Sequence, residues 1–128
     1  MASILMLGLE NDLADQLSLV LRLEGHDVQT AESVEQVVWH RSAEIVFAGG
    51  DGPDYREIVT RLASARPEVP VVLVNRLPEN SRWLDALELG AKDYCGAPFE
   101  AVQMRWLVGS VLRRPAATAA ATTAAAAA

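Results

Sequence analysis

The hydrophobic residues follow two alternating patterns along the chain. Short, nearly continuous apolar runs, such as Ile45 to Ala48, are typical of strands that are buried on both faces of a parallel sheet. In the stretches between them, apolar residues recur every three or four positions, which predicts amphipathic helices. The runs predict strands at residues 3–7, 26–30, 45–48, 71–75 and 93–95.

Polar residues and glycines mark the expected ends of the helices. Asn11 or Asp12 is expected to cap the first helix, and Gly90 suits the end of the fourth. Capping boxes are expected at residues 33–36 and 54–57, where Ser or Asp is followed three positions later by Gln or Glu. The helices are therefore expected to start near residues 11, 33, 54, 80 and 100.

Helical periodicity also predicts which side chains face the core. Leu84 and Leu87 are expected to point inward from the fourth helix, and Met104, Val108 and Val111 from the last. Strands that alternate with helices over short connections indicate an α/β fold. We expect a parallel sheet with right-handed crossovers and helices on both faces.

Composition narrows the class of protein. The chain has 128 residues, 51% apolar and 22% charged, as in an ordinary globular domain. Its net charge of −6 argues against direct binding of nucleic acid, which needs clustered Lys and Arg. No stretch reaches the roughly 20 apolar residues of a membrane span. The single cysteine, Cys95, excludes an internal disulfide, so we expect a cytoplasmic protein that contacts no membrane.

The composition changes near the C-terminus. Residues 115–128 read PAATAAATTAAAAA and lack both charges and an apolar period. We therefore expect one folded domain over residues 1–114, followed by a low-complexity tail or linker end.

The third expected strand runs directly into Gly49 and Gly50. In an open parallel sheet, ligands bind and reactions occur in the crevice outside the carboxyl ends of the strands. A glycine at the tip of that strand has no side chain that could attack phosphorus, transfer a proton or bind a metal ion. The sequence thus predicts the surroundings of a reaction site, with a residue at its centre that has no reactive side chain.

Several segments match one known family in order and spacing. Over residues 3–114 the chain resembles the receiver domain of bacterial two-component response regulators, which has a flavodoxin-like, doubly wound sheet of five parallel strands in the order 2-1-3-4-5. The segments that carry the resemblance are ILMLG, EGHDV, AEIVFAG, PEVPVVLV, and ALELGAKDY followed by APF.

The resemblance also implies where the phosphorylation site of such receivers would lie. They phosphorylate themselves on an aspartate that ends the third strand, with two acids that hold Mg²⁺, a hydroxyl residue and a lysine. In this chain the acids fall on Gly8 and Leu9, the phosphoacceptor on Gly49, the hydroxyl on Asn75 and the lysine on Ala97. We expect no catalytic residue, no metal site, no cofactor and no enzyme activity, because every group that phosphoryl transfer uses is replaced.

Two neighbouring acids are possible substitutes. Asp51 follows the strand tip but is expected to be a solvated residue of a Gly-Asp-Gly-Pro turn. Glu10 matches a family position that is often acidic, yet one carboxylate does not hold Mg²⁺ alone. By resemblance, Tyr94 is the switch aromatic, which the amide of Asn75 could hold in one state, and Ala97–Pro98 matches the family's cis peptide bond.

With an inert site, the output of such a domain would be a surface. The resemblance points to the face formed by the fourth helix, the fifth strand and the last helix, with Lys92, Asp93, Val102, Trp106 and Leu107 as the partner surface. There, Leu107 replaces an arginine that many DNA-binding members pair with the acid at Asp93, so a more apolar contact is expected. Trp39 and Trp83 are expected in the core.

These observations favour a phosphorylation-independent pseudo-receiver, which acts in a phosphorelay-type pathway by binding a protein partner or a second copy of itself. One alternative is a small-ligand sensor in which Gly8, Gly49 and Gly50 line the vacated pocket. Another is an atypical receiver that is still phosphorylated on Asp51. A cobalamin-binding flavodoxin-like domain is less favoured, because it needs a histidine after the first strand.

Overall fold

The computed structural model describes residues 2–77 and 80–113. The strands are β1 (Ser3–Leu7), β2 (Asp27–Ala31), β3 (Ile45–Gly49), β4 (Val71–Asn75) and β5 (Asp93–Gly96). The helices are α1 (Asn11–Leu23), α2 (Val34–Trp39), α3 (Tyr55–Ala65), α4 (Asn80–Leu89) and α5 (Ala101–Leu112). Strands and helices alternate throughout, as the hydrophobic pattern predicts.

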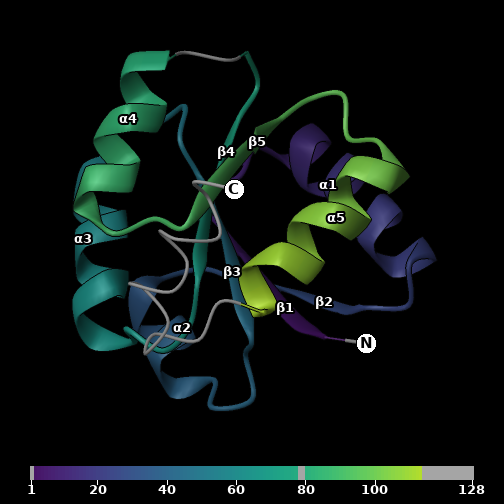
Figure 1. Ribbon diagram of the computed structural model, residues 1–128. Helices are drawn as coiled ribbons and strands as arrows, with labels where there is room; N and C mark the ends of the chain where they lie inside the picture. The colour runs from purple at the N-terminus through teal and green to yellow at the C-terminus, as the bar shows by residue number, and fades with distance from the viewer. Residues whose placement is uncertain (1, 78–79, 114–128) are drawn as a thin grey trace.

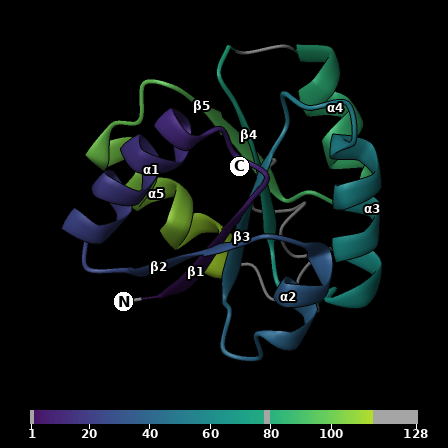
Figure 2. The ribbon, with the colours of Figure 1, turned by 180° about the vertical axis from the view of Figure 1, so that it is seen from behind.

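The strands form one parallel sheet in the order β2-β1-β3-β4-β5, which confirms the predicted fold class and topology. Helices α1 and α5 cover one face of the sheet, and α2, α3 and α4 cover the other (Figure 1). Figure 2 shows the same two layers from behind, with the sheet between them. The expected tail lies outside the described residues. None of the described helices is long and apolar enough to cross a membrane.

Each face of the sheet has its own hydrophobic core. Phe47 of β3 points toward α1 and α5, and Val46 and Ala48 point toward the opposite layer, because successive side chains of a strand alternate between faces. All five residues of β4 are buried, including Asn75. The central strands are therefore apolar on both sides, as their continuous runs predict.

The helix starts agree only in part with the capping prediction. Ser33 caps α2, and its Oγ accepts a hydrogen bond from the backbone N–H of Gln36 at 3.2 Å. The Gln36 side chain reaches back to the N–H of Glu32, one residue earlier than in a standard box. The capping predictions for α1 and α3 are wrong. The residues that precede these helices are Glu10 and Asp54, and neither side chain makes a capping hydrogen bond.

Gly90 ends α4 as predicted. Its φ is +121°, in the region that favours glycine. Its N–H donates to the carbonyl of Leu87 at 3.3 Å, and the N–H of Ala91 donates to that of Ala86 at 2.9 Å. These bonds form a Schellman motif, which satisfies carbonyl groups at the end of the helix.

The exposure of several large side chains differs from the prediction. Leu84 and Leu87 of α4 are 63% and 39% exposed, because Ala86 occupies the buried side of this helix. Trp39 of α2 is 73% exposed instead of buried in the core. Trp83 is half-buried at the second core. Apolar residues on more than one side of a helix make the inward face hard to assign from the sequence.

Candidate functional site at the carboxyl edge of the sheet

The loops after β1, β3, β4 and β5 meet at one end of the sheet, here called the carboxyl edge. Gly8 and Leu9 follow β1, Gly49 ends β3, Asn75 ends β4, and Ala97 follows β5. The fold therefore brings all five predicted positions of the degenerate site to the same edge, because strands in a parallel sheet end on the same side.

The backbone leaves no space for a side chain at Gly49. A Cβ atom added there would lie 2.1 Å from the carbonyl oxygen of Gly8 and 2.8 Å from its carbonyl carbon. Both neighbours are backbone atoms, so neither can move aside by a rotamer change. The β1–α1 loop thus packs directly on the tip of β3, where an aspartate side chain would have to stand.

Asn75 and Asp51 form a second contact across this edge. Asn75 is fully buried, and its Nδ2 donates to Oδ1 of Asp51 at 3.2 Å. The backbone N–H of Arg76 donates to Oδ2 of Asp51 at 2.8 Å. Asp51 is exposed, as predicted, but hydrogen bonds from Asn75 and Arg76 fix it, so it is more than a solvated turn residue. The Asn75 amide, which could have held Tyr94, binds Asp51 instead.

Arg76 was missed by the sequence analysis. Its guanidinium donates to both carboxylate oxygens of Asp12, at 2.8 and 2.7 Å, and its Nη2 lies 3.4 Å from Oε1 of Glu10. The hydrogen bond from Arg76 lowers the pKa of Asp12 below its ordinary value. The signal in the sequence was weak, since Arg76 and Asp12 are 64 positions apart.

A second arginine fixes the β3–α3 loop. Arg82 of α4 donates to the carbonyl oxygen of Gly50 at 2.6 Å and to that of Gly52 at 3.4 Å. Its guanidinium also lies 5.0 Å from the ring centre of Tyr55, within cation–π range. The loop that follows β3 is thus bound from both β4 and α4.

The space that remains at the carboxyl edge is small. A hollow of about 250 Å³ is lined by Gly8, Leu9, Glu10, Gly49 and Asp51, among others. Within residues 2–77 and 80–113, no group of three or more His, Cys, Asp or Glu side chains is placed to hold a metal ion.

Comparisons with known sequences and structures identify similar proteins, although no family model matches. Sensory transduction protein RegX3 of Mycolicibacterium smegmatis is 31% identical over 124 residues, which are 91% of this chain and 53% of the relative. The receiver domain of DrrB, solved in a BeF3-activated form, is 26% identical with a TM-score of 0.71, over 89% of this chain and 99% of that one. The chain has the receiver fold of response regulators.

A longer protein shares the same fold in one part. The structure of NtrX from Brucella abortus in complex with ADP is 26% identical with a TM-score of 0.77, over 88% of this receiver but only 26% of that chain. The receiver likewise spans about half the length of the curated relatives that it matches.

The residue expected as the switch aromatic lies beside α4. Tyr94 of β5 stacks on Trp83, with ring centres 3.9 Å apart and ring planes at 19°. The Ala97–Pro98 peptide bond is cis, as the resemblance implies. Among the described residues, Nε1 of Trp83 is buried without a hydrogen-bond partner.

The expected partner surface is only partly exposed. Val102 and Trp106 of α5 are 71% and 65% exposed, Lys92 is exposed and Asp93 is half-buried. The expectation for Leu107 is wrong: it is 6% exposed and packs in the core with Met104, because α5 turns this side toward the sheet.

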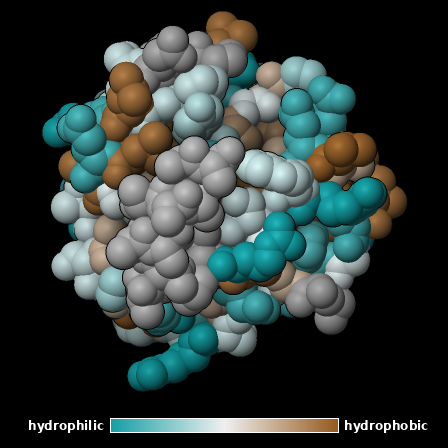
Figure 3. Space-filling view, viewed as in Figure 1, coloured by the Kyte–Doolittle hydropathy of each residue, from teal (hydrophilic) through white to brown (hydrophobic). Residues whose placement is uncertain are grey.

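A groove of about 650 Å³ runs between β5 and α5, lined by Trp83, Tyr94, Val102, Trp106 and other residues. Hydrophobic side chains also gather over α4 at the upper left of Figure 3. Leu84 and Leu87 are the exposed leucines of that helix. We call the surface formed by Leu84, Leu87, Tyr94, Val102 and Trp106 the α4–β5–α5 face.

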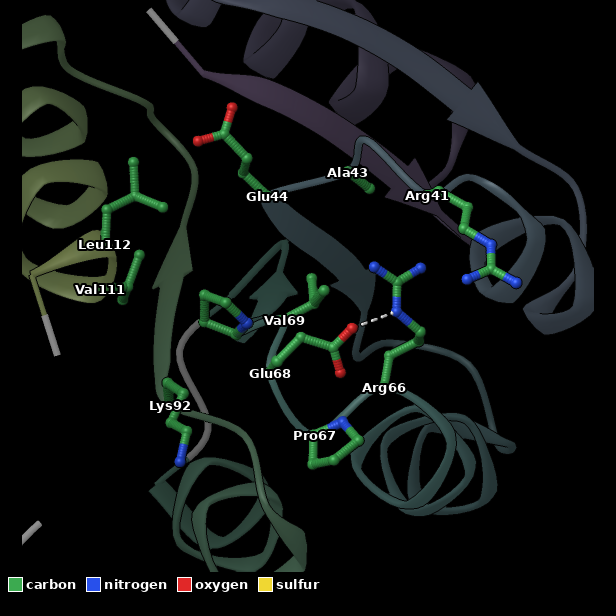
Figure 4. Close-up of a pocket in the computed structure, with 11 residues that line it drawn as sticks. Arg41, Ala43, Glu44, Arg66, Pro67, Glu68, Val69, Lys92, Val111 and Leu112 are labelled. Atoms are coloured by element: carbon green, nitrogen blue, oxygen red, sulfur yellow. Dashed lines mark hydrogen bonds and ion pairs between the residues drawn. The ribbon is translucent and has the colours of Figure 1, made fainter. Parts of the chain in front are cut away.

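Another hollow, of about 440 Å³, lies at the amino ends of β3 and β4, far from the carboxyl edge along the strands (Figure 4). Charged side chains line it, but Arg66 donates to Oε2 of Glu68 at 2.7 Å and to the carbonyl oxygens of Val37 and Val38. Arg66 therefore joins the end of α3 to the end of α2.

Cys95 is buried at the end of β5. Burial raises the pKa of its thiol to about 12, so the thiolate form that acts as a nucleophile is rare at neutral pH. Cys95 thus contributes to the core as a small apolar residue.

Proposed function

We propose that this receiver is a phosphorylation-independent signalling module, which acts in a two-component pathway through protein–protein contacts and has no catalytic activity of its own. The observation that carries the proposal is the contact between Gly49 and Gly8. An added Cβ at 2.1 Å from a backbone oxygen means that a phosphoacceptor does not fit at the tip of β3 in this arrangement.

The surroundings of Asp51 and the size of the hollow support the same proposal. Both carboxylate oxygens of Asp51 already accept hydrogen bonds, from Asn75 and from the backbone of Arg76, which disfavours attack on a phosphorus atom. The hollow of about 250 Å³ is smaller than the ≈ 300–1,000 Å³ typical of small-ligand pockets. Neither alternative gains support from this geometry.

The α4–β5–α5 face is the surface through which the module would act. Trp106 is 65% exposed beside an apolar groove, and exposed aromatic residues that border such grooves are frequent anchors of protein interfaces. The partner is a protein with a complementary apolar patch, or a second copy of this chain.

Capture of binding partners on the immobilised domain tests this proposal. The variants are Trp106→Ala and, as a matched control, Trp39→Ala, which removes a similarly exposed tryptophan from α2 near the opposite sheet edge. We expect Trp106→Ala to lose partner recovery or self-association, Trp39→Ala to retain it, and acetyl phosphate with Mg²⁺ to change neither. If all forms recover partners equally, the α4–β5–α5 face is not the binding surface. If recovery requires acetyl phosphate, the module does not act independently of phosphorylation.

A further inference from the structure

The hollow at the amino ends of β3 and β4 has both charged and apolar walls (Figure 4). Its volume of about 440 Å³ lies within the ≈ 300–1,000 Å³ typical of small-ligand pockets, which the hollow at the carboxyl edge does not reach. The charged residues that line it are Arg41, Glu44, Arg66, Glu68 and Lys92. This end of the sheet therefore offers both space and charge for a ligand.

Two guanidinium groups face each other in this hollow. Arg41 follows α2 and Arg66 follows α3, and Figure 4 shows the ends of their side chains pointing toward one another. Arg41 is exposed, and no group within residues 2–77 and 80–113 forms a hydrogen bond or ion pair with its side chain. Because like charges repel, an anion placed between the two guanidinium groups is favoured.

Arg66 is already held in the orientation that an anion would need. Its Nε donates to Oε2 of Glu68 at 2.7 Å, and its Nη1 lies 3.3 Å from the carbonyl oxygens of Val37, Val38 and His40. The side chain is only 13% exposed. Its Nη2 donates to no described residue, yet it is not among the buried unpaired atoms, so it reaches the surface of the hollow. A donor that is fixed in advance loses little conformational freedom when it binds a ligand.

The carboxylates of the hollow do not pair with both arginines. Glu68 binds Nε of Arg66, whereas Oε1 of Glu44 accepts a hydrogen bond from the backbone N–H of Ser3 at 3.0 Å. With Lys92, three cations line the hollow against two carboxylates, in a chain whose net charge is −6. Positive charge is thus in local excess here, against the overall charge of the protein.

We propose that this hollow binds a small organic anion, whose carboxylate or phosphate group accepts hydrogen bonds from Arg41 and from Nη2 of Arg66. The planar fork of a guanidinium matches the oxygen atoms of both groups. The apolar body of the ligand packs on Pro67, Val111 and Leu112, which line the same hollow. The inference goes beyond the proposed function, because the site lies at the other end of the strands from the carboxyl edge and shares no residue with the α4–β5–α5 face.

Titration of the domain with phenyl phosphate, benzoate and benzyl alcohol, followed by amide NMR signals, tests the anion site. The three compounds share an aromatic ring, but only the first two carry a negative charge. We expect both anions to cause saturable shifts at residues 41–44 and 66–69, and benzyl alcohol to cause none at the same concentrations. Inorganic phosphate, which lacks the apolar body, should bind several-fold more weakly than phenyl phosphate. The absence of saturable shifts with both anions, or equal shifts with benzyl alcohol, would overturn the proposal.

The same titrations with Arg41→Ala test the role of the guanidinium. Arg105→Ala is the matched control, because it removes another exposed arginine, which pairs with Glu24 of α1 and does not line the hollow. We expect Arg41→Ala to weaken the binding of both anions about tenfold, as for the loss of a hydrogen bond to a charged group.

Arg41→Lys keeps the charge without the fork and should weaken binding less than Arg41→Ala, and Arg105→Ala should bind like the wild type. Amide signals outside the hollow should be unchanged in each variant, since Arg41 has no described partner to lose. Equal affinities of Arg41→Ala and the wild type would overturn the proposed site.

Discussion

The carboxyl edge and the α4–β5–α5 face use their side chains in opposite ways. At the carboxyl edge, the polar groups of Asp12, Asp51 and Arg76 bind one another, and the backbone of Gly8 packs on Gly49. On the α4–β5–α5 face, Leu84 and Trp106 are more than half exposed, and Trp106 borders an apolar groove. The charged groups of the first region are paired with one another, although Oδ1 of Asn75 is buried without a hydrogen-bond partner, and the second region has apolar surface to bury.

This difference shows that the fold and the chemistry of a site depend on different residues. The parallel sheet needs only apolar strands and packed helices, so it persists when the residues at its carboxyl edge change. Binding surfaces depend on exposed apolar and aromatic groups, which the α4–β5–α5 face presents together. The predictions below challenge this contrast, starting with the largest expected effect.

Gly49→Asp places an acid where the resemblance to receivers leads us to expect the phosphoacceptor. We expect it to destabilise the fold by at least about 3 kcal/mol, because the new Cβ meets backbone atoms that cannot rearrange easily. Urea unfolding measures the effect. Gly52→Ala is the control, since an added Cβ there meets no described atom within 4 Å, and its effect should stay within about 0.5 kcal/mol. A Gly49→Asp variant as stable as the control would show that the edge is open.

Leu107→Ala and Trp106→Ala separate the core from the face at adjacent positions. Leu107→Ala should cost about 2–4 kcal/mol of unfolding free energy, because it leaves a cavity in the α1–α5 core. Trp106→Ala should change stability by less than about 1 kcal/mol. Similar losses from both, measured by urea unfolding, would mean that Trp106 is also part of the core and not of a binding face.

The Asp12–Arg76 pair predicts a pH dependence of stability. The pKa of Asp12 is lowered in the folded state, so the pair stabilises the fold above the ordinary pKa of an aspartate, and this contribution is lost as the pH falls through the lowered value. The stability difference between wild type and Asp12→Asn should therefore be present at neutral pH and vanish in strong acid. The same comparison with Asp15→Asn, an exposed position on α1, serves as the control. A difference that grows on acidification would contradict the pairing.

Cys95 predicts the smallest effect. With the pKa of its thiol raised to about 12, the native protein should react with a thiol reagent at mildly alkaline pH only as fast as it unfolds. A colorimetric thiol assay with and without urea measures this. Rapid labelling of the folded domain would show that the end of β5 opens readily.

Most of the fold could be predicted from the sequence, because buried strands and amphipathic helices leave periodic patterns that depend on neighbouring residues. The strand tips could be predicted as well, so Gly8, Gly49 and Asn75 lie at one edge, as expected. Arg76 was missed because its partner Asp12 is distant in the sequence and only the folded sheet brings them together.

Leu107 and Trp39 show a second limit of the sequence. Helix α5 carries apolar residues on more than one side, so the periodicity does not reveal that Leu107 faces the sheet and Trp106 does not. Trp39 ends a short helix, α2, whose buried side is occupied by Val34 and Val37. Burial at such positions depends on how the helix is rotated against its neighbours.

Intact-mass analysis after incubation with acetyl phosphate and Mg²⁺ tests the central claim most directly, with a receiver that carries the complete set of acidic residues as the positive control. The account predicts that the control gains the mass of a phosphoryl group while this domain keeps its original mass. A phosphoryl adduct on the wild-type domain, above all one that Asp51→Asn removes, would contradict it.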